Sequence, residues 1–74
     1  MALKNEGFAV CLVNEGFEVS LEVRKLYPVV RDPQIADHLI RVVDESGDDY
    51  LYPAKFFRKL SLPAELERVL RKAS

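Results

Sequence analysis

Two side chains of this sequence could together support nucleophilic catalysis, Cys11 and His38. A thiol needs a neighbouring base to form its reactive thiolate, and His38 is the single histidine of the chain. Cys11, however, lies within the continuous apolar run 8–13, where a cysteine packs as a small apolar side chain. We therefore expect Cys11 to be an inert core residue and His38 a polar surface residue, and we predict no catalytic residue and no enzymatic activity.

The residue types give little support to metal or cofactor chemistry. A structural zinc site needs about four ligands at short spacing, and the chain offers one Cys and one His. The acidic cluster within 44–49 lacks the spacing of a calcium-binding loop, and we interpret it as a solvated turn. The glycines never cluster, so no phosphate-binding loop can form. We predict no metal, no cofactor and no small-molecule substrate.

Aromatic and basic side chains after residue 49 suggest the binding of a macromolecule instead. Tyr50 and Tyr52 lie two residues apart, so they share one face of a strand. If that face is exposed, the two rings beside Lys55 and Arg58 suit stacking on a proline or a base; if it points inward, they are core residues. Our candidate partner-binding residues are therefore Tyr50, Tyr52, Lys55 and Arg58.

The composition is that of one small folded domain. The residues are 49% hydrophobic and 31% charged, a composition too apolar for a disordered chain. A chain of 74 residues is short enough to form a single core. The net charge is −1, so the whole chain has no strong field for nucleic acid or acidic membranes. Residues 1–57 nevertheless carry ten acidic and six basic side chains, whereas residues 58–74 carry two acidic and five basic side chains.

The sequence also favours a cytoplasmic location. No apolar run approaches the roughly 18 residues of a membrane span, and the first residues lack the pattern of a secretory signal. A lone cysteine cannot form an intramolecular disulfide, which fits a reducing compartment. We expect a cytoplasmic protein without a membrane partner.

Hydrophobic patterning predicts mainly β structure. The run 8–13 and the strictly alternating segment 17–24 predict strands, each after an Asn-Glu-Gly triplet whose glycine we expect at positive φ. Residues 39–53 predict a tight hairpin around Gly47. Residues 54–57 predict one helical turn with two core aromatic rings, and 58–62 a last strand. Residues 63–73 predict a helix with one apolar face that must pack on another surface.

The hairpin, the segment Tyr52-Pro53-Ala54-Lys55-Phe56-Phe57 and the short last strand together resemble the end of a Src-homology-3-like barrel. In such domains an aliphatic or aromatic residue and a proline precede a single 3₁₀ turn, so the resemblance implies that fold. The chain lacks the tryptophan and the early tyrosines of peptide-binding members, and Lys55 and Phe56 stand where the turn usually has Asn and Tyr. The resemblance therefore does not imply a groove for proline-rich peptides.

A second resemblance spans most of the chain. The runs 14–27 and 41–53, with an Asn-Glu-Gly-aromatic start at 14–17 and an Asp-Glu-Ser-Gly-Asp-Asp-Tyr-Leu-Tyr-Pro segment at 44–53, resemble a group of short uncharacterised bacterial proteins. This resemblance implies no activity.

These observations predict one domain over residues 1–74. We expect a small Src-homology-3-like five-stranded barrel, or a strongly bent antiparallel sheet, at 7–62, followed by a short C-terminal helix at 63–73. The function that we predict is a small non-catalytic binding or regulatory module that acts on a protein partner or self-associates. The alternative is a nucleic-acid-binding barrel that uses the basic residues of 55–72.

Overall fold

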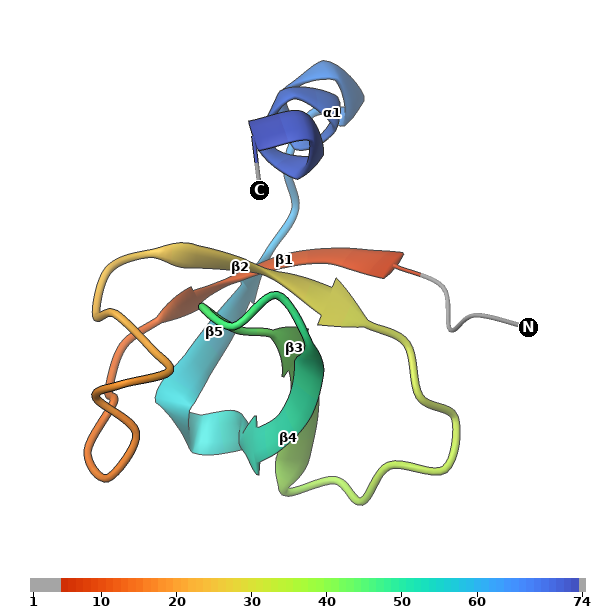
Figure 1. The fold of residues 1–74 in the computed structure, drawn as a ribbon. Coiled ribbons are helices and arrows are strands. Elements are labelled where there is room, and N and C mark those ends of the chain that lie inside the picture. Colours follow the sequence, from red (N-terminus) through yellow and green to blue (C-terminus); the bar gives the residue numbers. More distant parts are fainter. Residues whose placement is uncertain (1–4, 74) are drawn as a thin grey trace.

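The computed structural model describes residues 5–73, which form one antiparallel sheet and a C-terminal helix (Figure 1). The elements are β1 (Asn5–Cys11), β2 (Leu26–Val30), β3 (Leu39–Val43), β4 (Asp49–Pro53), the 3₁₀ turn η1 (Ala54–Phe56), β5 (Phe57–Leu60) and α1 (Ala64–Ala73). The strand order is β4-β3-β2-β1-β5. The predicted mainly β fold with a short C-terminal helix is confirmed. The sheet is not closed, because β4 and β5 remain its two edges, so the structure does not confirm a barrel.

The predicted hairpin at 39–53 is confirmed as β3 and β4. Its pairing runs from Leu39 opposite Pro53 to Val43 opposite Asp49. The connecting turn is stabilised by the Asp44 side chain, which accepts the Ser46 N–H at 2.9 Å, and by Gly47 at a φ of 87°. The predicted helical turn is η1, and β5 follows it directly.

The core lies between the two halves of the curved sheet. Side chains from β1, β2, β3, β4 and β5 meet there with one residue from the β1–β2 loop: Ala9, Cys11, Leu21, Tyr27, Val29, Ile40, Val42, Tyr52 and Phe57. Phe57 and Tyr52 pack at a centroid distance of 6.2 Å, and η1 adds the partly buried Phe56. The expectation that Cys11 is a core residue is confirmed.

The predicted strand at 17–24 is wrong. This segment forms a series of turns within the β1–β2 loop, in which Leu21 is buried while Val19 is 96% exposed. The physical reason is that the segment satisfies its backbone groups without pairing as a strand, because the Ser20 and Leu21 N–H groups donate to the Phe17 carbonyl and the Arg24 N–H donates to the Cys11 carbonyl. Turn hydrogen bonds to the Asn14 and Phe17 carbonyls hold the loop instead.

The glycines of both Asn-Glu-Gly triplets adopt positive φ, as the sequence predicts, but in different settings. Gly7, at 84°, lies within β1 where the pairing with β2 shifts between Asn5 and Phe8, which is a β-bulge. Gly16, at 87°, lies in a turn of the β1–β2 loop, and no strand begins at Phe17.

The predicted C-terminal helix is confirmed as α1, which stands beside β1 on the side of the sheet opposite η1 (Figure 1). The Arg71 guanidinium lies 5.4 Å from the centre of the Phe8 ring, and Glu67 approaches Gly7. Glu67 and Arg71 also form an ion pair at 3.3 Å. The helix therefore meets β1 through the charged side chains of Glu67 and Arg71, and its Leu70 is also partly buried.

Candidate partner-binding site

The two candidate tyrosines of β4 share one face of the strand, as predicted, but differ in burial. Tyr52 lies opposite Ile40 and is 4% exposed, whereas Tyr50 lies opposite Val42, near the hairpin turn, and is 50% exposed. The Tyr52 hydroxyl donates a hydrogen bond to the Asp44 carboxylate inside the protein. Tyr52 therefore forms the base of a surface, and Tyr50 forms part of its exposed wall.

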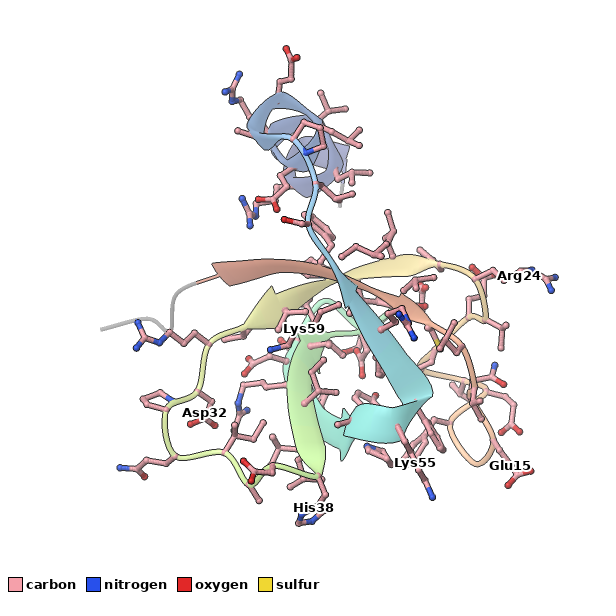
Figure 2. The ribbon with its side chains drawn as sticks, turned by 180° about the vertical axis from the view of Figure 1, so that it is seen from behind. Glu15, Arg24, Asp32, His38, Lys55 and Lys59 are labelled. Atoms are coloured by element: carbon pink, nitrogen blue, oxygen red, sulfur yellow. The ribbon has the colours of Figure 1, made fainter. Side chains whose placement is uncertain are left out.

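The two candidate basic residues lie outside this surface. Lys55 is exposed on η1 and points outward at the same end of the view as Glu15 and His38 (Figure 2). Arg58 follows the core residue Phe57 in β5, so its side chain points to the opposite face of the sheet. The structure thus brings Tyr50 and Tyr52 together and separates Arg58 from them.

A groove of about 390 Å³ lies between the β1–β2 loop, β4 and the hairpin turn. We call it the aromatic groove, and it is lined by Phe17, Ser20, Asp44, Ser46, Tyr50, Leu51 and Tyr52. Three of its apolar members remain on the surface, since Phe17 is 36%, Leu51 43% and Tyr50 50% exposed. Apolar side chains gathered on a surface in this way are typical of an interaction site.

Phe17 is the aromatic residue of this groove that the sequence patterning did not select. Its ring packs edge-on against Tyr52 at a centroid distance of 5.0 Å and against Phe56 at 5.9 Å. Such edge-to-face pairs add about 0.5–1.5 kcal/mol beyond their buried area. The feature of the sequence that could have identified Phe17 is the Asn-Glu-Gly triplet before it. A turn at this triplet reverses the chain and brings the Phe17 ring back to the sheet.

Hydrogen bonds fix the loop that carries Phe17. The Phe17 N–H donates to the Asn14 carbonyl at 2.7 Å, and the Asn14 side-chain amide donates to the Leu21 carbonyl at 2.9 Å. The start of the loop is tied to η1, because the Leu12 and Val13 N–H groups both donate to the Phe56 carbonyl. The aromatic groove is therefore built on a loop with defined anchors.

Asp44 is the polar centre of the groove. It is 7% exposed, so burial on its own would raise the pKa of its carboxyl group. Hydrogen bonds from the Ser46 hydroxyl, the Tyr52 hydroxyl and the Ser46 N–H outweigh burial and hold the pKa below its usual value. The interpretation of 44–49 as a wholly solvated turn is therefore wrong for Asp44, whereas the other acids of the cluster are exposed.

A second network joins the hairpin turn to the β1–β2 loop. The Tyr27 hydroxyl donates to Glu45 and accepts the Glu22 N–H at 2.7 Å, while Lys25 pairs with Glu45 at 2.7 Å. Burial, followed by the bond to Glu45, raises the pKa of Tyr27 well above its usual value, and Lys25 lowers that of Glu45. Together with the Glu45 N–H bond to the Ser20 carbonyl, this network fixes both walls of the groove.

A second cavity, of about 320 Å³, lies between the loop 31–38, β3 and β5. Arg41 and Asp32 both line it and pair with each other at 3.0 Å. Arg41 also pairs with Asp49 at 3.0 Å, and these two carboxylates raise the pKa of its guanidinium. Its charge is therefore compensated within the protein, so this basic side chain is poorly suited to holding a phosphate.

The two residues with nucleophile or base chemistry lie in different environments. Cys11 is fully buried, its thiol donates to the Val13 carbonyl at 3.3 Å, and burial raises its pKa. His38 is exposed at the end of the loop before β3. Between residues 5 and 73 there is no group of His, Cys, Asp and Glu side chains that could hold a metal ion. No helix in that part of the chain has the length and apolar character to span a membrane.

Comparisons of the chain with protein-family models, with curated proteins and with solved structures found no match.

Proposed function

We propose that this protein is a small non-catalytic binding module whose aromatic groove holds a segment of a protein partner. The observation that carries the proposal is the placement of Phe17 and Tyr50, two partly exposed rings, around the buried Tyr52. The buried Tyr52 ring packs on Phe17 at a centroid distance of 5.0 Å and so gives a partner a preformed apolar contact, which lowers the entropy lost on binding.

The chemistry of the groove favours an extended segment with both apolar and basic side chains. Apolar residues of the partner would pack against Phe17 and Tyr50, where aromatic side chains dominate binding energy. The hairpin turn 44–49 beside the groove carries four acidic and no basic side chains. Two of these acids are paired with Lys25 and Arg41, and Asp44 accepts hydrogen bonds from Ser46 and Tyr52, which leaves Asp48 exposed in the turn. A basic side chain of the partner would complement Asp48.

The fold and the location belong to the same proposal. The hairpin β3–β4, the 3₁₀ turn and the short β5 follow one another in the order that the Src-homology-3-like resemblance implies, so we propose an open form of that barrel. The lone, buried Cys11 supports a cytoplasmic location.

A random-peptide display library selected against the purified protein tests the proposed function. We expect peptides rich in aromatic and basic residues, and we expect Phe17→Ala to weaken their binding at least about tenfold, the usual loss for a central aromatic. Val19→Ala is the matched control, because Val19 lies in the same loop, is 96% exposed and is not part of the groove. Circular dichroism of both variants verifies their folding.

Two outcomes contradict the proposal. Selected peptides whose binding is insensitive to Phe17→Ala would place the contact elsewhere. Binding of single-stranded oligonucleotides with a steep loss of affinity on added salt, in the absence of peptide binding, would favour the nucleic-acid alternative.

A further inference from the structure

β4 is an edge strand, with β3 on one side and no strand on the other among residues 5–73. Main-chain groups on the outer side of an edge strand can pair with an extended segment of another chain, which then adds a strand to the sheet. The aromatic groove is lined by Leu51 and Tyr52, whose side chains point to opposite faces of β4. A groove that both residues line passes along the edge of this strand.

The hydrogen bonds at the two ends of the β3–β4 hairpin show which residue pairs are bonded. The Asp44 N–H donates to the Asp48 carbonyl at 3.1 Å, and the Ala54 N–H donates to the His38 carbonyl at 2.8 Å. Between these bonds the pairing proceeds one residue at a time on each strand. Bonded and non-bonded pairs alternate along an antiparallel ladder, so every second pair counted from either end is bonded.

This alternation identifies the main-chain groups on the outer edge of β4. Tyr50 and Tyr52 belong to bonded pairs, so their N–H and C=O groups face β3. Asp49 and Leu51 belong to the pairs between them, so the N–H and C=O groups of both residues point away from β3. Pro53 ends this series, because it has no N–H to donate. The outer edge therefore presents donors and acceptors at the spacing of a strand.

The outer edge is accessible to a partner. Leu51 is 43% and Tyr50 50% exposed, and Asp49 is exposed as well. A charged side chain on an edge strand commonly blocks the addition of another strand. Here the Asp49 carboxylate pairs at 3.0 Å with Arg41 of β3, which draws it over the sheet and away from the outer edge. The charge on β4 therefore does not obstruct strand addition.

The two segments that border the groove favour a basic partner. Residues 13–22 of the β1–β2 loop carry three acidic side chains, the hairpin turn 44–49 carries four, and neither segment carries a basic one. Glu18, Glu22 and Asp48 are exposed members of this set. Lysine and arginine side chains of a bound segment would complement these carboxylates.

We propose that an extended basic segment of a partner protein binds as an added strand on the outer edge of β4; this inference rests on the proposed function. The main chain of the segment pairs with Asp49 and Leu51, and its alternate side chains contact Phe17 and Tyr50 in the aromatic groove. A proline-rich segment lacks the N–H groups that this pairing needs. The binding mode therefore differs from the recognition of a polyproline helix.

N-methyl scanning of a bound peptide tests the added strand. The probe is the tightest-binding peptide from the display selection, synthesised with one main-chain N-methyl group at each position in turn. We expect the Kd to rise at least about tenfold at every second position of the contact stretch and to change little at the positions between, because only alternate N–H groups face β4. Losses without this alternation, in a peptide that still depends on Phe17, would overturn the added strand and leave the proposed function intact.

Leu51→Pro tests the same pairing on the protein. The substitution removes the Leu51 N–H from the outer edge and leaves Tyr50 and Tyr52 paired with β3, and proline is tolerated on the free side of an edge strand. We expect it to raise the Kd of the probe peptide at least about tenfold. Leu51→Ala is the matched control, because it shortens the side chain and keeps the N–H. Equal affinities of the two variants for the peptide would overturn the proposal.

Amide hydrogen exchange followed by NMR provides a readout on the unmodified protein. Saturation with the probe peptide should slow exchange of the Leu51 and Asp49 amides at least about tenfold, because both become hydrogen-bonded. The Val19 amide is the reference, because Val19 is 96% exposed and lies outside the groove. Unchanged exchange at Leu51 in the saturated complex would overturn the proposal. Slower exchange on raising the protein concentration without peptide would show a second copy at this edge and would also overturn it.

Discussion

The aromatic groove and helix α1 both expose apolar side chains, but they are supported in different ways. Phe17 in the groove packs on two rings, and its loop is tied to η1 by hydrogen bonds from Leu12 and Val13. Leu66 and Val69, the exposed apolar residues of α1, extend from a helix that touches the sheet through Arg71 and Glu67. The first surface is fixed before any partner arrives, whereas the second is presented by a weakly held element.

This difference has an energetic consequence. Substitutions in the groove and its base should change the stability of the monomer, because those side chains belong to the core or contact it. Substitutions of Leu66 and Val69 should leave the free energy of unfolding nearly unchanged, because both side chains are exposed. Substitution of the same residue type should therefore change the free energy of unfolding strongly in one region and little in the other. Matched pairs of variants can measure this difference.

Leu21 and Leu66 form the matched pair with the largest expected difference. Leu21 is 1% exposed and anchors the β1–β2 loop in the core, whereas Leu66 is 43% exposed on α1. We expect Leu21→Ala to lower the free energy of unfolding by about 2–5 kcal/mol. We expect Leu66→Ala to change it by less than about 0.5 kcal/mol. Urea denaturation measures both values.

Equal losses for the two leucines would contradict the comparison. That result would show that Leu66 of α1 packs on the sheet in solution.

The two tyrosines of β4 sharpen the comparison within the groove. Tyr52→Phe removes the hydroxyl that donates to the buried Asp44, so we expect a loss of about 1–3 kcal/mol in unfolding free energy. Tyr50→Phe changes an exposed hydroxyl, and we expect less than about 0.5 kcal/mol. Chemical denaturation distinguishes them. A similar small effect at both positions would mean that the Tyr52–Asp44 bond is not maintained in solution.

Local patterns in the sequence predicted much of the fold. The hairpin 39–53 has strand-forming residues around Gly47, the turn 54–57 follows Pro53, and α1 directly follows Pro63 and has a clear apolar face. Each depends on residues close together in the chain. The segment 17–24 alternates as a strand does, yet it forms turns, because its N–H groups bond to the Phe17 and Cys11 carbonyls instead of to a neighbouring strand. The alternation of apolar residues does not show that these turn bonds are available.

The candidate site shows the same limit. The alternation of Tyr50 and Tyr52 correctly predicted a shared face, but burial of one and exposure of the other depends on how the sheet curves. Arg58 was grouped with them by proximity in sequence, and its position one residue after Phe57 directs it to the opposite face. Phe17 reaches the groove through a loop, so a contact over 35 residues with Tyr52 was not predictable from patterning.

Acid pH provides the prediction with the smallest expected effect. The folded-state pKa of Asp44 is depressed, so its contribution to stability is present above the unfolded value, about 3.9, and is lost as pH falls through the folded value. We expect the unfolding free energy to fall below about pH 4, and Asp44→Asn to make this decline shallower. Asp48→Asn is the control, because Asp48 is exposed in the same turn. Denaturation curves between about pH 2 and 7 measure the slopes, and equal slopes for wild type and Asp44→Asn would show that the buried carboxylate is not a source of acid sensitivity.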